Sequence, residues 1–313
     1  MQKGSLPHNS ARELTGLWLD GASPSKSDLR AANSLAARLA CFDGLRPFSG
    51  VVQRLIDHVS CPEFNLDEVR RLIESDPALA ARILRVANSA AYRGHGPCAS
   101  VAQAIVRIGA TNVSGLAMAM SAMTLFKDLG GVGQSIRDHS AGTAAVAREL
   151  AFCFDHAAIS SKVFLAGLLH DLGKLLLIQT GDTAYATLVA QEPSPCSLHI
   201  REQALWGFDH ATLGAHVLVS WNIPEPIPQL IACHHQPKGG QGGASALAQA
   251  LDILRLADVV DWLLGQGCTA DSPWVQRLTE SPDGVRVGLV EETLPMLWDS
   301  LRTIRAEALL VFK

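Results

Sequence analysis

Residues 66–86 read LDEVRRLIESDPALAARILRV, and this stretch decides the fold class. Its apolar residues recur mostly at steps of three and four, which is the spacing of one face of an α-helix and not of a β-strand. The pair Asp76-Pro77 interrupts the pattern. Aspartate is a good N-terminal helix cap, and proline is tolerated in the first helical position. The stretch therefore predicts two helices that meet at Asp76-Pro77.

The same helical spacing continues in both directions along the chain. Residues 100–126 show two helical patterns that are split near Gly109, and residues 136–153 show a long alanine-rich one. The sequence lacks alternating β-branched runs joined by Asn-Gly turns, which are the usual signals of strands and hairpins. We therefore predict an all-α protein.

Segments rich in glycine, proline or serine divide the helical patterns into blocks. The best internal boundary is KDLGGVGQ at residues 127–134, because it separates two helical blocks. We expect one two-block helical module at 45–264, with short flanks on either side. Its parts are an N-terminal block at 45–127, an acidic block at 134–264, a partly helical extension at 1–44 and a helical tail at 265–313.

The charge balance argues against a general nucleic-acid-binding protein. The 313 residues include 26 lysines and arginines against 30 aspartates and glutamates, which gives a formal net charge of −4. After residue 110 the chain carries 13 basic and 20 acidic residues. An acidic surface repels a phosphate backbone and attracts cations. Nucleic acid is therefore an improbable partner, and the second half suits cations better.

The cysteines and the N-terminus favour a cytoplasmic protein. The seven cysteines are scattered, and no CxxC pair occurs among them. This spacing suggests neither a zinc knuckle nor a disulfide framework. The first residues run into polar ones without an apolar signal region, and polar residues interrupt the longest apolar stretches. We expect no signal peptide and no membrane span.

The most informative motif for chemistry is GLLHDLGKL at residues 167–175. It places His170 and Asp171, two residue types that bind metals, inside an apolar run where burial is costly unless they are coordinated or hydrogen-bonded. Neighbours on a helix point about 100° apart, so both reach one ion only near a helix end or in a crevice. Lys174 lies on the same side and could hold an anionic group. The alternatives are a polar pair satisfied by hydrogen bonds, and a lysine that only stabilises a helix C-terminus.

Further candidate ligands follow the same logic of polar groups in apolar surroundings. They are His139, His210, the doublet His234-His235, and Asp258. A mixture of imidazole and carboxylate ligands suits iron, manganese, zinc, nickel or cobalt better than calcium. One or two divalent ions are thus possible, and the sequence does not choose among the metals.

The order of these residues resembles the HD superfamily of metal-dependent phosphohydrolases, whose diagnostic element is an H…HD…D set on helices. The span from about 45 to 264 looks like the HDOD branch, the HD-related output domain of bacterial signalling proteins. Several separate motifs in that branch's order carry the likeness. They are IESDPAL at 73–79, VANSAAY at 86–92, SVAQAI at 100–105, GLLHDLGK at 167–174, FDHA at 208–211 and WNIP at 221–224.

The resemblance implies two metal positions. One ion would take His139, His170, Asp171 and Asp258, and a second would take His210, His234 and His235, with Asp171 bridging them. In such enzymes two metals produce a nucleophile and clamp a phosphate, and Lys174 would then neutralise its charge, which makes Asp171 and Lys174 the candidate catalytic residues.

The sequence departs from the related HD-GYP phosphodiesterases. After His235 it continues Gln236-Pro237 without their Glu and Gly-Tyr-Pro elements, and Ser135 stands where some of them have a glutamate ligand. Hydrolysis of cyclic di-GMP is therefore not expected. Since HDOD domains are regarded as regulatory output modules, the resemblance implies signalling through protein contacts in trans. The alternative is an active phosphohydrolase on a nucleotide or another phosphate ester.

Overall fold

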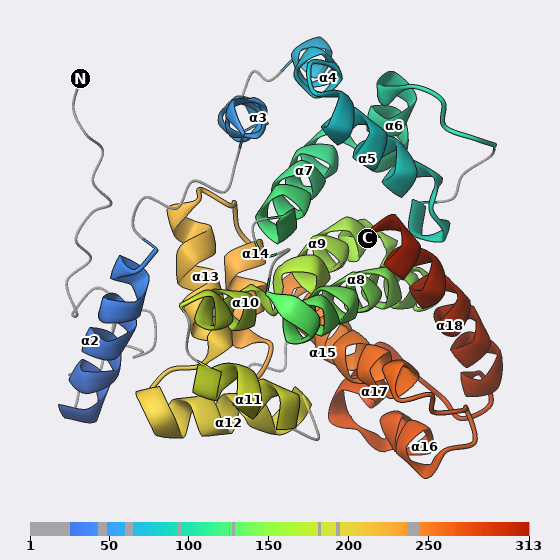
Figure 1. The fold of residues 1–313 in the computed structure, drawn as a ribbon. Helices are drawn as coiled ribbons and strands as arrows, with labels where there is room; N and C mark the ends of the chain where they lie inside the picture. Colours follow the sequence, from blue (N-terminus) through green and yellow to red (C-terminus); the bar gives the residue numbers. More distant parts are fainter. Residues whose placement is uncertain are drawn as a thin grey trace.

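The structure is a computed structural model, and it describes residues 26–42, 49–59, 65–92, 96–124, 126, 129–180, 183–191, 195–236 and 245–312. Throughout this described part the regular structure is helical and contains no strand (Figure 1). The all-α prediction is confirmed. Residues 1–25 of the expected N-terminal extension lie outside the described residues.

The first helical block contains the two helices predicted from residues 66–86. Its helix α4 ends at Glu74 and α5 begins at Pro77, and the Asp76 side chain accepts hydrogen bonds from the first backbone amides of α5. The predicted split near Gly109 is also present, and this glycine has a φ of 92°, which side chains rarely adopt. The helices of this block are α3 (Gly50–Val59), α4 (Leu66–Glu74), α5 (Pro77–Asn88), α6 (Val101–Ile108) and α7 (Ala110–Thr124).

The second block is built around one long helix, α8, which spans Gly130–Cys153 and so begins six residues before the predicted pattern at 136. It packs most extensively against α9, α15 and α18. The other helices of the block are α9 (Ser160–Leu169), α10 (Leu172–Gln179), α11 (Thr183–Gln191), α12 (Pro195–Trp206), α13 (His210–Ser220), α14 (Ile227–Cys233) and α15 (Ala246–Gly265).

Helices flank these two blocks on both sides. Helix α2 (Lys26–Ala40) lies against α12 and α13, while α18 (Leu294–Val311) packs along α8 (Figure 1). The remaining elements are α16 (Pro273–Glu280), α17 (Pro282–Val287) and the short 3-10 helices η1 (Ala90–Tyr92) and η2 (Ala157–Ile159). Within the described segments, no helix combines the length and the apolar character that crossing a membrane requires.

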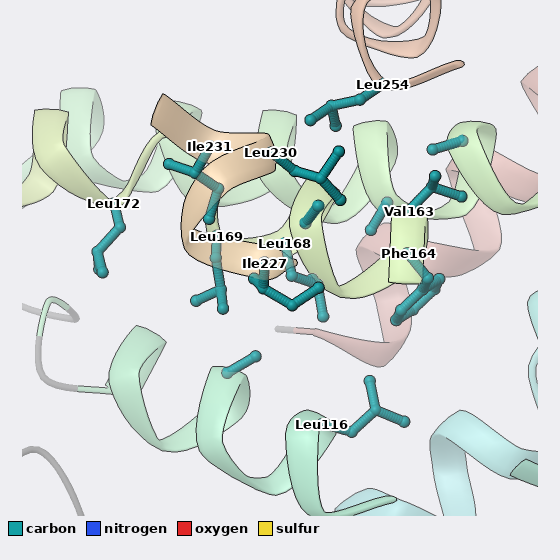
Figure 2. Close-up of a cluster of buried hydrophobic side chains, with 14 of the residues drawn as sticks. Leu116, Val163, Phe164, Leu168, Leu169, Leu172, Ile227, Leu230, Ile231 and Leu254 are labelled. Carbon is teal, nitrogen blue, oxygen red and sulfur yellow. The ribbon is translucent and has the colours of Figure 1, made fainter. Parts of the chain in front are cut away.

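The core extends from the first block into the second. Figure 2 shows Leu116 of α7 facing α9, whose side chains Val163 and Leu168 lie between it and Leu230 of α14. All four side chains are at most 2% exposed. Because α9 is buried on several sides, the residues at its C-terminal end are held inside the protein, where the His-Asp pair lies.

Candidate metal centre

The His-Asp pair occupies the break between two helices. His170 is the C-terminal cap of α9, and Asp171 is the residue before α10. The sequence predicts that both side chains reach one ion only near a helix end or in a crevice, and the structure has them at a helix end. The other candidates come from α8 (His139), α13 (His210), the end of α14 (His234 and His235) and α15 (Asp258).

The first ligand group joins α8, α9 and α15. Its members are His139, His170 and Asp258, and one nitrogen or oxygen from each lies within 4.8 Å of the others. His139 Nε2 is 2.9 Å from Asp258 Oδ1, and His170 Nε2 is 3.8 Å from the same oxygen. Asp171 Oδ2 lies 3.5 Å from His170 Nε2 and 3.9 Å from His139 Nε2. These four side chains surround one small volume.

The second ligand group lies on the other side of Asp171. Its members are His210, His234 and His235, which again offer nitrogens within 4.8 Å of one another. His210 Nε2 is 3.0 Å from His235 Nε2 and 3.3 Å from Asp171 Oδ1. The two oxygens of Asp171 therefore face different groups, which is the geometry that a bridging carboxylate needs.

Three buried atoms of this centre test whether a cation fits. Among the described residues, His170 Nε2, Asp171 Oδ1 and His234 Nε2 have no hydrogen-bond partner. Nδ1 of His170 is 2.8 Å from Gly167 O, and Nδ1 of His234 is 2.6 Å from Ile231 O. In both histidines Nδ1 therefore donates a hydrogen bond and Nε2 presents a lone pair. Buried polar atoms are normally satisfied. Two imidazole lone pairs and a carboxylate oxygen, all without donors, fit a divalent cation.

Two further carboxylates contact candidate-ligand histidines, and the sequence analysis did not identify these carboxylates. Asp261 Oδ2 is 2.7 Å from His139 Nδ1, and its other oxygen accepts from Arg305 Nε of α18 at 2.8 Å. Glu202 Oε2 is 2.6 Å from His210 Nδ1. Such second partners fix the tautomer and orientation of metal-binding histidines. Asp261 follows Asp258 by one helical turn, which was an available signal, whereas nothing near Glu202 in the sequence marks it.

The electrostatics divide the histidines into two kinds. Burial by itself would lower the pKa of His139 and His210, but the carboxylates beside them raise these pKa values to about 10 and about 9. Burial lowers the pKa of His234 to about 3, with His170 and His210 adding to the effect. Burial would raise the pKa of Asp171, yet the neighbouring cationic groups hold it well below its usual value. Asp171 is therefore a buried anion.

Lys174 does not have the surroundings expected of a helix C-terminal charge. It lies in the first turn of α10, so the interpretation that it stabilises a helix C-terminus is wrong. Its Nζ donates to Asp171 Oδ2 at 2.7 Å, and the residue is only 6% exposed. Burial lowers the pKa of Lys174, but Asp171 more than compensates, so the pKa is raised and the lysine is charged. Lys174 thus neutralises Asp171 in this structure.

A cavity of about 520 Å³ leads to the second ligand group. Its lining includes His234, His235 and Asp258 of the ligand groups, together with Arg255 and Arg286. Both arginines are engaged, because Arg255 donates to backbone carbonyls at 2.7 and 3.0 Å and Arg286 pairs with acidic side chains. The cavity therefore gives access to His234 and His235, two of the candidate ligands.

Comparison with known proteins agrees with this architecture. The family model of the HDOD domain matches residues 45–237, so Asp258 and Asp261 lie beyond the matched range. An uncharacterised protein of Treponema pallidum (strain Nichols) is 25% identical over 185 residues, which are 59% of this chain and 36% of that protein. The chain thus spans about a third of the length of this curated relative.

Two solved structures share the fold over almost their whole length. An HDOD domain protein of unknown function from Geobacter sulfurreducens superposes with a TM-score of 0.66 at 24% identity, covering 89% of this chain and 97% of that one. A proposed phosphohydrolase from Shewanella amazonensis SB2B superposes with a TM-score of 0.67 at 21% identity, covering 90% and 98%. A proposed signal transduction protein from Marinobacter aquaeolei VT8 has a TM-score of 0.61 at 22% identity, and the match covers 90% of this chain and 65% of that one. Since the family model matches more than half of the sequence, the chain belongs to the HDOD domain family.

Proposed function

We propose that this protein is an HDOD signalling module that acts through contacts with other signalling proteins and holds a divalent metal ion in its histidine and aspartate centre. The observation that carries the metal is the set of three buried atoms without hydrogen-bond partners in the described structure, His170 Nε2, Asp171 Oδ1 and His234 Nε2. Imidazole and carboxylate donors of this kind favour iron, manganese, zinc, nickel or cobalt. Residues 45–264 are proposed as the module, with 1–44 and 265–313 as its flanks.

The side chains of the centre would form two binding positions, for one ion or two. His139, His170, Asp171 and Asp258 would hold a first ion, and His210, His234 and His235 a second. Asp261 and Glu202 would keep Nε2 of His139 and His210 pointed at the ions by accepting from their Nδ1 atoms. A bound ion would supply the charge that offsets the buried carboxylates and would act as a Lewis acid on any bound phosphate.

The basic side chains around the site already contact other protein groups, and this favours regulation over hydrolysis. In a phosphohydrolase, metal ions and hydrogen-bond donors share the task of receiving the negative charge of a phosphate. Lys174 is paired with Asp171, and Arg286 is paired with Asp252 and Asp283. Arg255 is bound to backbone carbonyls. These contacts already use part of the donor capacity of each cation.

The alternative function is a metal-dependent phosphohydrolase that acts on a nucleotide or another phosphate ester. The specific observation in its favour is that the 520 Å³ cavity opens directly onto His234, His235 and Asp258. A cavity of this size falls within the range of small-molecule sites. In that case Asp171 would bridge the ions, and Lys174 would have to turn toward the substrate.

Metal analysis of the purified full chain, followed by turnover assays, tests both functions. We expect the protein to bind Mn²⁺ or Fe²⁺ and Asp171→Ala to lose that binding. We also expect the metal-loaded protein to hydrolyse neither nucleotides nor bis-p-nitrophenyl phosphate. Metal addition should instead change backbone amide hydrogen exchange in α18, which Arg305 joins to the centre through Asp261.

Each half of the proposal has its own contrary result. If the folded protein binds none of these metals, the proposal of a metal site is refuted. Turnover at ordinary enzymatic rates that Asp171→Ala abolishes would establish the phosphohydrolase in place of the regulatory module.

A further inference from the structure

A second cavity, of about 350 Å³, lies between the two helical blocks and has no lining residue in common with the metal centre. We call it the arginine cavity. Figure 1 shows α5 and α7 on one side of α8 and α9, with the C-terminal end of α18 beside them. The lining residues are Arg82, Arg85, Met120, Met123, Thr124, Gln134, Arg137, Ser140, Ala141, Leu168, Val311 and Phe312.

Three arginines, Arg82, Arg85 and Arg137, give the lining of the cavity a positive charge. Arg82 and Arg85 lie three residues apart on one face of α5, and neither makes a hydrogen bond or an ion pair within the described residues. Arg70 on the preceding helix, by contrast, is paired with Glu74 and Asp67. Arg137 donates to Phe126 O and to Gln134 Oε1, so it adds charge while it is held in place.

A buried hydroxyl group provides a second and independent sign of a ligand. Ser140 is 1% exposed, and its Oγ has no hydrogen-bond partner in the described structure. Serine in a helix interior usually bonds to a carbonyl one turn earlier, as Ser114 does with Ala110 O at 3.1 Å. A buried hydroxyl without a partner is costly, and a ligand that bonds to it would remove that cost.

The rest of the wall is apolar and adaptable. It is formed by Met120 and Met123 of α7, Leu168 of α9, and Val311 and Phe312 at the end of α18. Methionine side chains fit irregular apolar shapes well. An inorganic anion would satisfy the arginines but leave this surface without a partner.

We propose that the arginine cavity binds a small organic anion, with a phosphate or carboxylate group on an apolar body. The anionic group would lie at Arg82, Arg85 and Ser140, and the body against Met120 and the other apolar side chains. Cavities of this size and mixed lining are typical of small-molecule sites. The occupant would touch α5 and α7 of the first block together with α8 and α18, so it would stabilise their present packing.

The arginine cavity and the metal centre use different faces of one helix. Arg137 and His139 are two residues apart on α8 and therefore point about 200° away from each other. Ser140 directly follows His139. A ligand in the arginine cavity would thus contact α8, the helix that carries His139, without touching the metal. Its binding can be measured in metal-free protein.

Fluorescence of 1-anilinonaphthalene-8-sulfonate, an organic anion with an apolar body, tests the proposal on the full chain. Its competitors are decanoate, adenosine 5′-monophosphate and inorganic phosphate. We expect saturable binding of the dye that decanoate or the nucleotide displaces, and displacement by inorganic phosphate only at far higher concentration. Displacement by decanoate would assign an aliphatic body, and displacement by the nucleotide an aromatic base.

Variants locate the binding. Arg82→Glu, at a partly exposed position, and Thr124→Trp, which fills the cavity, should each weaken dye binding at least about tenfold, as expected for the loss of a charge-assisted contact or of the space itself. Arg54→Glu is the matched control, because this exposed arginine of α3 lies outside the cavity. The proposal is overturned if the wild type does not bind the dye or if both cavity variants bind as the control does. Displacement by inorganic phosphate as effective as by the organic anions, or by none of the three competitors, would also overturn it.

Discussion

Replacing Asp261 by asparagine should weaken metal binding although Asp261 is not itself a ligand. Its Oδ2 is 2.7 Å from Nδ1 of His139, and the residue is 1% exposed. The asparagine side chain would keep the shape of the aspartate but remove the negative charge that favours electron donation by the imidazole. Loss of such a second partner typically lowers metal affinity about 10- to 100-fold, which is about 1.4–2.8 kcal/mol. We expect the Kd for Mn²⁺ to rise by that factor in Asp261→Asn.

A second aspartate on the same helix provides the matched control. Asp252 of α15 is 5% exposed, and its two oxygens are each 3.1 Å from nitrogens of Arg286. Asp252→Asn and Asp261→Asn each weaken a buried pair with an arginine, so both should lower the free energy of unfolding. Only Asp261 contacts a histidine of the metal centre. Calorimetric titration of metal-stripped protein with Mn²⁺ should therefore show weaker binding in Asp261→Asn alone.

The comparison also defines the refuting results. If Asp261→Asn binds Mn²⁺ as tightly as the wild type, the contact with His139 does not support a ligand. If both variants lose affinity equally, the effect comes from general destabilisation of α15 and not from the hydrogen bond.

Three further changes test packing and charge, two of them at the metal centre. Lys174→Met removes the ammonium group that is paired with the buried Asp171 carboxylate. Urea unfolding of metal-free protein should therefore show a loss of about 3–5 kcal/mol in the free energy of unfolding, and added Mn²⁺ should largely restore it. A loss that Mn²⁺ does not reduce would contradict the metal site. Gly142→Ala places a methyl group where Asp261 Oδ1 lies. The metal affinity measured by titration should therefore fall as it does in Asp261→Asn. An unchanged affinity would show that the Asp261 carboxylate can move without any effect on metal binding. Burial lowers the pKa of His216 to about 4, so this histidine takes up a proton in the unfolded chain before it does so in the folded protein as the pH falls. Between pH 7 and pH 4 the free energy of unfolding of the wild type should therefore fall by up to about 3 kcal/mol relative to that of His216→Gln. Stability curves of the two proteins that stay parallel over this pH range would refute the prediction.

Local signals in the sequence predict the helices and the position of the His-Asp pair well. Asp76-Pro77 marks a helix start because a capping carboxylate and a residue without an amide hydrogen suit that position alone. Gly109 marks a break because its backbone conformation excludes most side chains. The sequence predicts His170 and Asp171 near a helix end or in a crevice, because adjacent side chains on a helix point about 100° apart.

The supporting residues could not be predicted in the same way, because their role depends on which helices meet. Glu202 lies on α12 and reaches His210 across the turn before α13, and in the sequence it is indistinguishable from a surface acid. Among the acids of the second half, the sequence predicts only Asp171 and Asp258 as metal ligands, and the structure adds an acid that supports a ligand. This acid is Asp261, which lies one helical turn after Asp258 and so reaches Nδ1 of His139.

Arg305 links the C-terminal helix α18 to the metal centre. The tail was expected to be a flank of the module, yet Arg305 of α18 holds the carboxylate that in turn holds His139. The end of the same helix also lines the arginine cavity through Val311 and Phe312. A ligand in the cavity and an ion in the centre would thus both favour one position of α18. By linkage, two ligands that favour the same packing strengthen each other's binding, whereas a partner protein that draws α18 away would weaken both.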